Sequence, residues 1–66
     1  MNWNEIYDKL IKSRQNRILD KDIYTETHHI IPRCMSGNDD KNNLIELTAR
    51  EHYIAHLILY KIYPNN

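Results

Sequence analysis

The residues from Tyr24 to His56, YTETHHIIPRCMSGNDDKNNLIELTAREHYIAH, decide the fold of this 66-residue chain. They hold all four histidines, arranged as the neighbours His28 and His29 and as the pair His52 and His56. Between the two pairs lies a segment dense in Ser, Gly, Asn and Asp, a composition typical of loops. We therefore expect two ordered pieces of chain, each carrying histidines, joined by a loop.

The two ends of this loop read as strands. Residues 23–31, IYTETHHII, are rich in β-branched and aromatic side chains and predict a strand that ends at Pro32. Asn43–Leu47 predicts a short second strand, antiparallel to the first. We expect Gly37, the only glycine, to make the sharp turn of the loop.

A helix follows the second strand. Thr48 and Glu51 have the spacing of a capping box, in which each side chain bonds the backbone amide of the other residue. The helical pattern continues to about Tyr63 and stops before Pro64. We expect an apolar face formed by Ile54, Leu57, Ile58 and Ile62. The opposite side should carry His52, His56, Tyr60 and Tyr63.

The N-terminal residues 1–20 predict a further helix. Its apolar residues recur at helical spacing and form one face, namely Trp3, Ile6, Tyr7, Leu10 and Ile11. Asn2 or Asn4 is the candidate N-cap, and the helix should end near Asn16. The basic residues Lys9, Lys12, Arg14, Arg17 and Lys21 form either a solvated face, which we favour, or a weak phosphate-facing patch.

The chain is thus predicted to be one small α+β domain, in which the helix of residues 1–20 packs on a core formed by residues 21–66. A domain of this size has a marginal core, and its single cysteine, Cys34, excludes an internal disulfide. A metal, a partner or further chain should therefore stabilise it.

Charge and hydropathy narrow the function. The formal net charge of zero counts against a free-standing DNA-binding protein, which depends on neutralising phosphates. No apolar run reaches the roughly 18 residues of a membrane span, and the N-terminus has no secretory pattern. We expect a cytoplasmic protein that contacts no membrane.

The histidine spacing indicates a metal. His52 and His56 lie one helical turn apart, a geometry that suits one ion but is weak evidence alone. His28 and His29 are successive strand residues that point to opposite faces, so only one of them can join the helix pair. Three protein ligands predict a catalytic rather than a structural site, and the fourth histidine could act as general base. The alternatives are four hydrogen-bonded histidines or a closed structural zinc site.

The string H-H-I-I-P, the loop with Gly37, Asn43-Leu44, Leu47 and the two helix histidines resemble the HNH nucleases. These enzymes share a ββα-metal fold and cut nucleic-acid backbones. From Tyr24 to about Leu59 the chain is similar to the HNH domains of phage-encoded homing-type endonucleases. Residues 1–20 lie outside the resemblance.

The resemblance implies a role for each matching position. His28, His52 and His56 match the metal ligands, His29 matches the general base, and Asn43 matches the asparagine that ties the loop and holds the base strand. The implied activity is DNA hydrolysis with one divalent ion and nicking of one strand. Three imidazoles suit Zn²⁺, Ni²⁺ or Mn²⁺, whereas the asparagine-for-histidine variants favour Mg²⁺, so the identity of the ion is open.

Two departures accompany the match. Ser36 stands where many HNH nucleases have a second glycine, and the CxxC pairs that bind a separate structural zinc are missing, so we expect no second metal. Homing-type relatives usually carry DNA-binding repeats after the nuclease core. We therefore expect an additional DNA-binding domain or partner outside this chain and, for a phage-encoded protein, activity in the bacterial host cytoplasm.

Other polar residues near the motif have two interpretations each. Arg33 either clamps a phosphate or pairs with Asp39 or Asp40. Glu26 either orients a ligand imidazole or forms a surface pair, and we favour the surface pair. Cys34 has no second cysteine with which to bind a metal. The competing function is a non-catalytic nucleic-acid- or protein-binding module with a structural metal.

Overall fold

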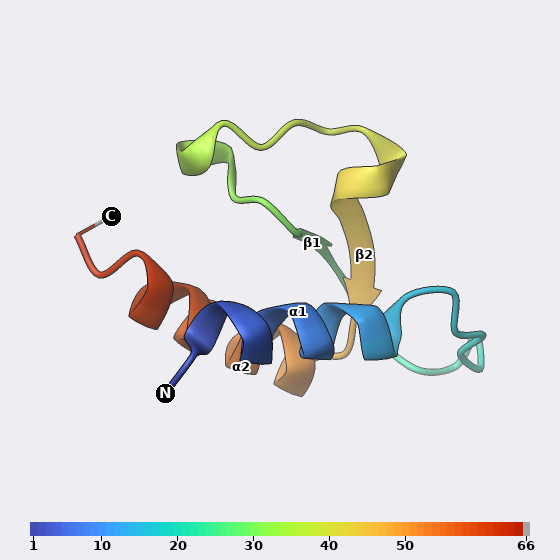
Figure 1. The fold of residues 1–66 in the computed structure, drawn as a ribbon. Coiled ribbons are helices and arrows are strands. Elements are labelled where there is room, and N and C mark those ends of the chain that lie inside the picture. Colours follow the sequence, from blue (N-terminus) through green and yellow to red (C-terminus); the bar gives the residue numbers. More distant parts are fainter. Residues whose placement is uncertain (66) are drawn as a thin grey trace.

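The computed structural model describes residues 1–65 and confirms the predicted α+β arrangement of an N-terminal helix, a two-stranded antiparallel hairpin and a C-terminal helix (Figure 1). The elements in chain order are α1 (Trp3–Arg14), β1 (Glu26–His29), β2 (Leu44–Leu47) and α2 (Ala49–Ile62). Two short 3₁₀ turns, Arg33–Met35 and Lys41–Asn43, lie within the loop that joins the strands.

Helix α1 begins at the predicted cap. The side-chain oxygen of Asn2 accepts a hydrogen bond from the Glu5 amide at 3.1 Å. The helix ends at Arg14, slightly before the predicted Asn16. Asn16 has a left-handed backbone conformation with φ 60°, which a right-handed helix cannot continue through.

The hairpin is shorter than the sequence suggests. β1 covers only Glu26–His29 of the predicted strand 23–31, and β2 begins at Leu44 because Asn43 belongs to a 3₁₀ turn. In the register His28 pairs with Ile45 and His29 with Leu44. β-propensity alone overestimated the length of the first strand, because β1 extends only as far as β2 pairs with it.

Helix α2 confirms the predicted capping box and corrects the predicted apolar face. The Thr48 amide donates to the Glu51 carboxylate at 2.8 Å, and the Glu51 amide donates to the Thr48 hydroxyl at 3.3 Å. The buried residues of the helix are Ala55, Ile58 and Leu59, whereas Ile54 is 37% exposed and Leu57 is 49% exposed. Size misled the prediction, because the completely buried Ala55 lies on the side that faces the rest of the protein.

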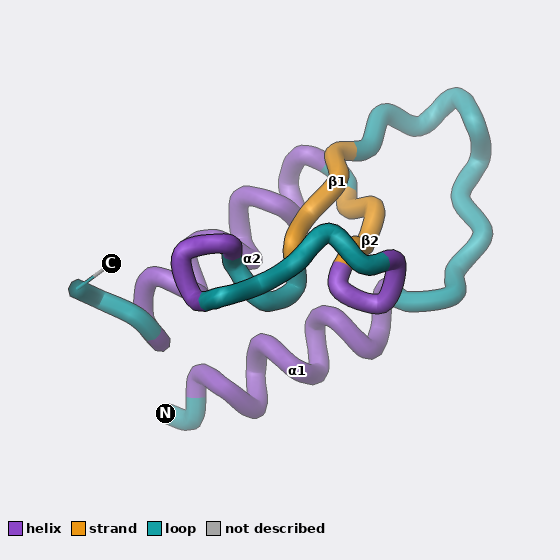
Figure 2. The backbone as a smooth tube through the Cα atoms, turned by 90° about the horizontal axis from the view of Figure 1, so that it is seen from above, coloured by secondary structure: helices purple, strands orange, loops and turns teal. Residues whose placement is uncertain are grey.

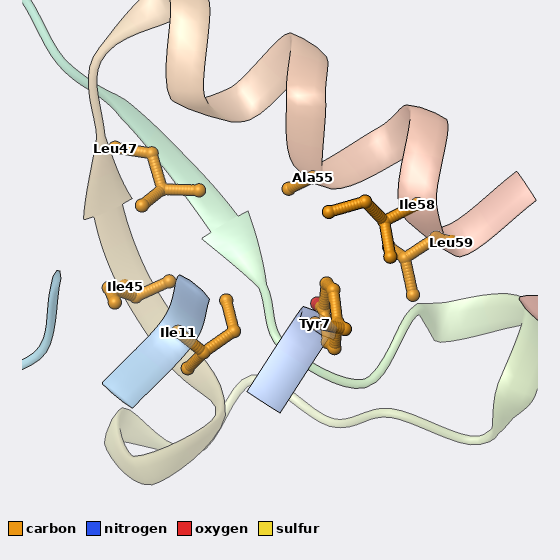
Figure 3. Packing of buried hydrophobic residues seen from close by; sticks show 7 residues of the cluster. All are labelled: Tyr7, Ile11, Ile45, Leu47, Ala55, Ile58 and Leu59. Carbon is orange, nitrogen blue, oxygen red and sulfur yellow. The ribbon is translucent and has the colours of Figure 1, made fainter. Parts of the chain in front are cut away.

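Helix α2 packs against both α1 and the hairpin, as Figure 2 shows from above. The side chains that meet between these elements form one core (Figure 3). Its buried members are Tyr7, Ile11, Ile45, Leu47, Ala55, Ile58 and Leu59. The predicted face of α1 is confirmed, since Trp3, Ile6 and Leu10 pack at the edge of this core. Neither helix of the described chain is long and apolar enough to cross a membrane.

The sharp turn of the loop differs from the prediction. Ser36, not Gly37, adopts the left-handed conformation, with φ 70°. Gly37 is required for a different reason: a Cβ atom there would lie 1.7 Å from the carbonyl oxygen of Ile31. Its hydrogen side chain therefore permits the two arms of the loop to approach closely.

Candidate metal centre

The structure brings three of the four histidines together. His28 comes from β1, and His52 and His56 come from successive turns of α2. Each offers one ring nitrogen, and these atoms all lie within 4.8 Å of one another. His28 is buried, with 2% of its surface exposed, while His56 reaches the surface. These are the three residues that the sequence predicts as ligands.

A carboxylate orients one of the rings. Nδ1 of His52 lies 2.7 Å from a carboxylate oxygen of Glu26. This bond, and a second one from the Tyr24 hydroxyl, hold the pKa of Glu26 below its ordinary value, so the carboxylate is ionised and can only accept. Nδ1 of His52 therefore carries the hydrogen. Nε2 of His52 lies 3.1 Å from Nε2 of His56.

Glu26 thus orients a candidate ligand and does not form the surface pair that we favoured from the sequence. Glu26 and His52 are 26 positions apart in the chain, so no local sequence pattern could indicate this contact. Only the place of Glu26 on the same face of the strand as His28 pointed toward the cluster.

Two rings of the cluster, those of His28 and His56, resist protonation. Burial, followed by the neighbouring charges of His52 and His56, lowers the pKa of His28 to about 4. Burial and His52 also lower the pKa of His56. Neutral imidazoles keep lone pairs for a metal, and three of them are a donor set that suits divalent transition ions. The residues therefore fit one divalent metal ion.

Tyr7 of α1 contacts the buried ligand candidate. Its hydroxyl oxygen lies 2.8 Å from Nε2 of His28, and the hydroxyl donates to the Ile30 carbonyl at 2.6 Å. Burial raises the pKa of the Tyr7 phenol, which keeps it protonated. Sequence reasoning assigned Tyr7 to the core alone. The available signal was the hydroxyl itself, because a buried tyrosine O–H usually finds a polar partner.

His29 stands apart from the three-ring cluster and binds the loop. Its Nε2 lies 2.7 Å from a carboxylate oxygen of Asp39. The Arg33 guanidinium donates to both oxygens of the same carboxylate, at 2.9 and 3.0 Å. These bonds, with that of His29 the larger, lower the pKa of Asp39. Of the two interpretations of Arg33, the structure contains the pairing with Asp39.

Asn43 braces the loop between the strands. Its side-chain oxygen accepts from the Ile31 amide at 2.8 Å, and its side-chain nitrogen donates to the carbonyls of Ile31 and Asn38 at 3.1 and 2.7 Å. Its backbone carbonyl accepts from the Ile30 amide at 2.8 Å. One buried residue therefore fixes the chain immediately after His29 to the chain immediately before β2.

Several basic residues of the N-terminal segment form ion pairs within the protein. Arg14 and Arg17 both bind the Glu51 carboxylate, and the Arg14 contact is 2.7 Å long. Lys9 pairs with Glu5. A hollow of about 600 Å³ borders Arg14 and Arg17, and none of the four histidines lines it. This surface is therefore separate from the three-histidine cluster.

A smaller, mostly apolar hollow of about 240 Å³ adjoins the exposed side of the centre. The residues that line it are Pro32, Cys34, His56, Leu59, Tyr60 and Tyr63. The exposed ring of His56, a candidate ligand, therefore borders this hollow.

Comparison with known proteins places this geometry in context. The chain is 64% identical to the probable mobile endonuclease E of Enterobacteria phage T4, over 97% of the chain and 45% of that protein. The chain resembles the phage T4 mobile endonucleases. Mobile endonuclease B is 59% identical over 96% of the chain and 25% of its own length, and mobile endonuclease D is 55% identical over 100% and 27%.

The resemblance to phage homing-type endonucleases that the motif indicated is thus confirmed. The chain spans less than half the length of each of these phage T4 endonucleases. No protein-family model matches the chain, and no solved structure matches it.

Proposed function

We propose that the chain is the nuclease module of a metal-dependent HNH endonuclease that hydrolyses DNA phosphodiester bonds and nicks one strand. The observation that carries the proposal is the convergence of three imidazole nitrogens, from β1 and α2, within 4.8 Å of one another. The names of the phage T4 relatives support the same activity. Three protein ligands leave room in a coordination sphere for a substrate oxygen.

In this proposal His28, His52 and His56 hold one divalent ion. When bound, the ion supplies positive charge that stabilises the charge developing on the phosphate and the leaving oxygen. Zn²⁺, Ni²⁺, Mn²⁺ and Mg²⁺ are the candidates, and the imidazole donor set favours the first three.

His29 acts as the general base. The ionised Asp39 carboxylate only accepts hydrogen bonds, so the hydrogen of neutral His29 lies on Nε2, the atom that contacts Asp39. Its Nδ1 is then unprotonated and can take a proton from the attacking water. Asp39 is a positioning residue in this scheme, because it acts by orienting His29.

Asn43 and Arg33 act around the base. Asn43 bonds the backbone of Ile30 and Ile31, directly after His29, and thereby holds His29 in place. Arg33, whose side chain is 70% exposed, provides a cation for a neighbouring phosphate. The neutral chain and the greater length of its relatives support an additional DNA-binding segment or partner, and phage relatives support action in the bacterial host cytoplasm.

The test is incubation of supercoiled plasmid with the chain and Mg²⁺, Mn²⁺, Ni²⁺ or Zn²⁺, with open-circular product as the readout. His29→Ala should abolish cutting and leave metal affinity nearly unchanged, whereas His56→Ala should lower both. Tyr53→Phe, at an exposed site on α2, is the control. Full metal binding without cutting under any ion would instead support the non-catalytic module. A large loss of metal affinity in His29→Ala would mean that His29 is the metal ligand and His28 the general base.

A further inference from the structure

The contact between Tyr7 and His28 can be assigned by counting hydrogens. A phenol has one O–H to donate and lone pairs to accept. The Tyr7 hydroxyl gives its hydrogen to the Ile30 carbonyl, since a carbonyl can only accept. The Tyr7 oxygen must therefore be the acceptor toward His28, and Nε2 of His28 must be the donor.

This assignment fixes the tautomer of His28. A neutral imidazole carries one N–H, so a ring that is protonated at Nε2 has its lone pair at Nδ1. We propose that Tyr7 selects Nδ1 of His28 as the metal-binding atom, which makes Tyr7 of α1 a positioning residue of the metal centre. The inference rests on the proposed function, because it presumes that His28 binds the ion.

The same device occurs twice around the cluster, with the nitrogens reversed. Glu26 accepts a hydrogen from Nδ1 of His52 and so directs Nε2 of that ring toward the cluster. Tyr7 holds the hydrogen of His28 on Nε2 and leaves its Nδ1 unprotonated. Partners of this kind orient metal-binding histidines in proteins generally.

The inference gives α1 a purpose beyond packing. Tyr7 is 6% exposed, and its ring belongs to the hydrophobic core. Its hydroxyl extends past that core to the buried His28 ring and to the backbone just after β1. Residues 1–20 lie outside the stretch that resembles the nuclease motif. They nevertheless supply the hydroxyl oxygen of Tyr7, which orients the His28 ring.

The first experiment reads the tautomer in the unmodified chain. Nitrogen–proton NMR of isotope-labelled histidine rings distinguishes Nε2–H from Nδ1–H, and addition of diamagnetic Zn²⁺ shows which nitrogen binds. We expect Nε2–H for His28 without metal and Zn²⁺ on Nδ1. Binding through Nε2 of His28 would overturn this inference and leave the proposed function standing. Absence of any metal binding would overturn both.

The second experiment removes one oxygen atom. Tyr7→Phe keeps the ring in the core, and we expect its folded form to populate the Nδ1–H tautomer of His28 and to bind Zn²⁺ about 10- to 100-fold more weakly. Tyr53→Phe, at an exposed position of the same residue type, should change neither quantity. If Tyr7 has only a structural role, Tyr7→Phe should lower the melting temperature and leave the His28 tautomer and the Zn²⁺ affinity of the folded protein at wild-type values. That result would overturn the inference.

Discussion

Nδ1 of His52 donates a hydrogen bond to Glu26 at 2.7 Å and so joins α2 to β1 beside the three-histidine cluster. The two residues lie 26 positions apart in the chain. Because this bond sets both the tautomer and the angle of the His52 ring, the carboxylate should control how well the ring binds a metal.

Replacement of this carboxylate should weaken metal binding. In Glu26→Gln we expect the Zn²⁺ affinity, measured by titration calorimetry, to fall about 10-fold, because a neutral amide orients and polarises the His52 ring less strongly. Glu46→Gln is the matched control, since Glu46 also lies on the hairpin but bonds Thr25 and Thr27, on the strand face opposite His28. Equal affinities in the two variants would show that the Glu26 contact is incidental.

The loop carboxylate should affect the reaction and not the metal. In Asp39→Asn we expect plasmid nicking to slow by about 10- to 100-fold, part of the contribution that a general base makes, because His29 loses the partner that fixes its tautomer. Zn²⁺ affinity should be unchanged. Asp40→Asn, one residue further along the exposed loop, serves as the control. A fall in Zn²⁺ affinity would assign Asp39 to the metal centre.

The capping residue Glu51 should make stability depend on pH. Hydrogen bonds from Arg17, the Thr48 amide and Arg14 hold its pKa well below the ordinary 4.5, against the opposing effect of burial. A carboxylate whose pKa is lower in the folded state than in the unfolded state stabilises the protein. This contribution is fully present at pH values above the unfolded-state pKa and is lost as the pH falls from there through the folded-state pKa. We expect Glu51→Gln to cost about 1–2 kcal/mol at neutral pH and progressively less below about pH 4.

Urea unfolding across this range tests the prediction, with Glu5→Gln as the control. Glu5 also forms an ion pair with a basic side chain, that of Lys9. Both groups are largely exposed, so Glu5→Gln should change the free energy of unfolding little. A cost for Glu51→Gln that stays constant down to acid pH would assign the effect to lost packing rather than to charge.

The loop offers two substitutions of opposite sign. Gly37→Ala should destabilise the fold by at least about 2 kcal/mol, because its Cβ would meet the backbone carbonyl of Ile31. Ser36→Gly should stabilise it by about 1 kcal/mol, since a left-handed conformation strains any residue with a Cβ. Thermal unfolding measures both. Similar effects of the two changes would mean that the loop rearranges freely.

Metal should stabilise the small core. At a free Zn²⁺ concentration about one hundred times the dissociation constant, binding to the folded state adds about 2.7 kcal/mol to the free energy of unfolding. We therefore expect a chelator to lower the melting temperature of the wild-type chain. His56→Ala should melt at nearly the same temperature with and without chelator. An unchanged wild-type melting temperature would contradict the role of the metal in stability.

Much of the fold was predictable because it depends on neighbours in the sequence. The capping box of Thr48 and Glu51 and the apolar face around Tyr7 follow from spacings of three or four residues, which the helix geometry converts directly into contacts. The same rule placed His52 and His56 on one face of α2. The alternation of strand side chains indicated that His28 and His29 would separate, and in the structure His28 joins the cluster while His29 binds Asp39.

The sequence by itself therefore determined the order of the elements and the residues able to bind a metal. Only the tertiary structure decided which face of α2 is buried, that Glu26 orients His52, and that Tyr7 reaches His28. These contacts join residues that are 21 or more positions apart, or depend on how closely two elements approach, as at Ala55 and Gly37. Local patterns carry no information on such distances, because the packing of whole elements sets them.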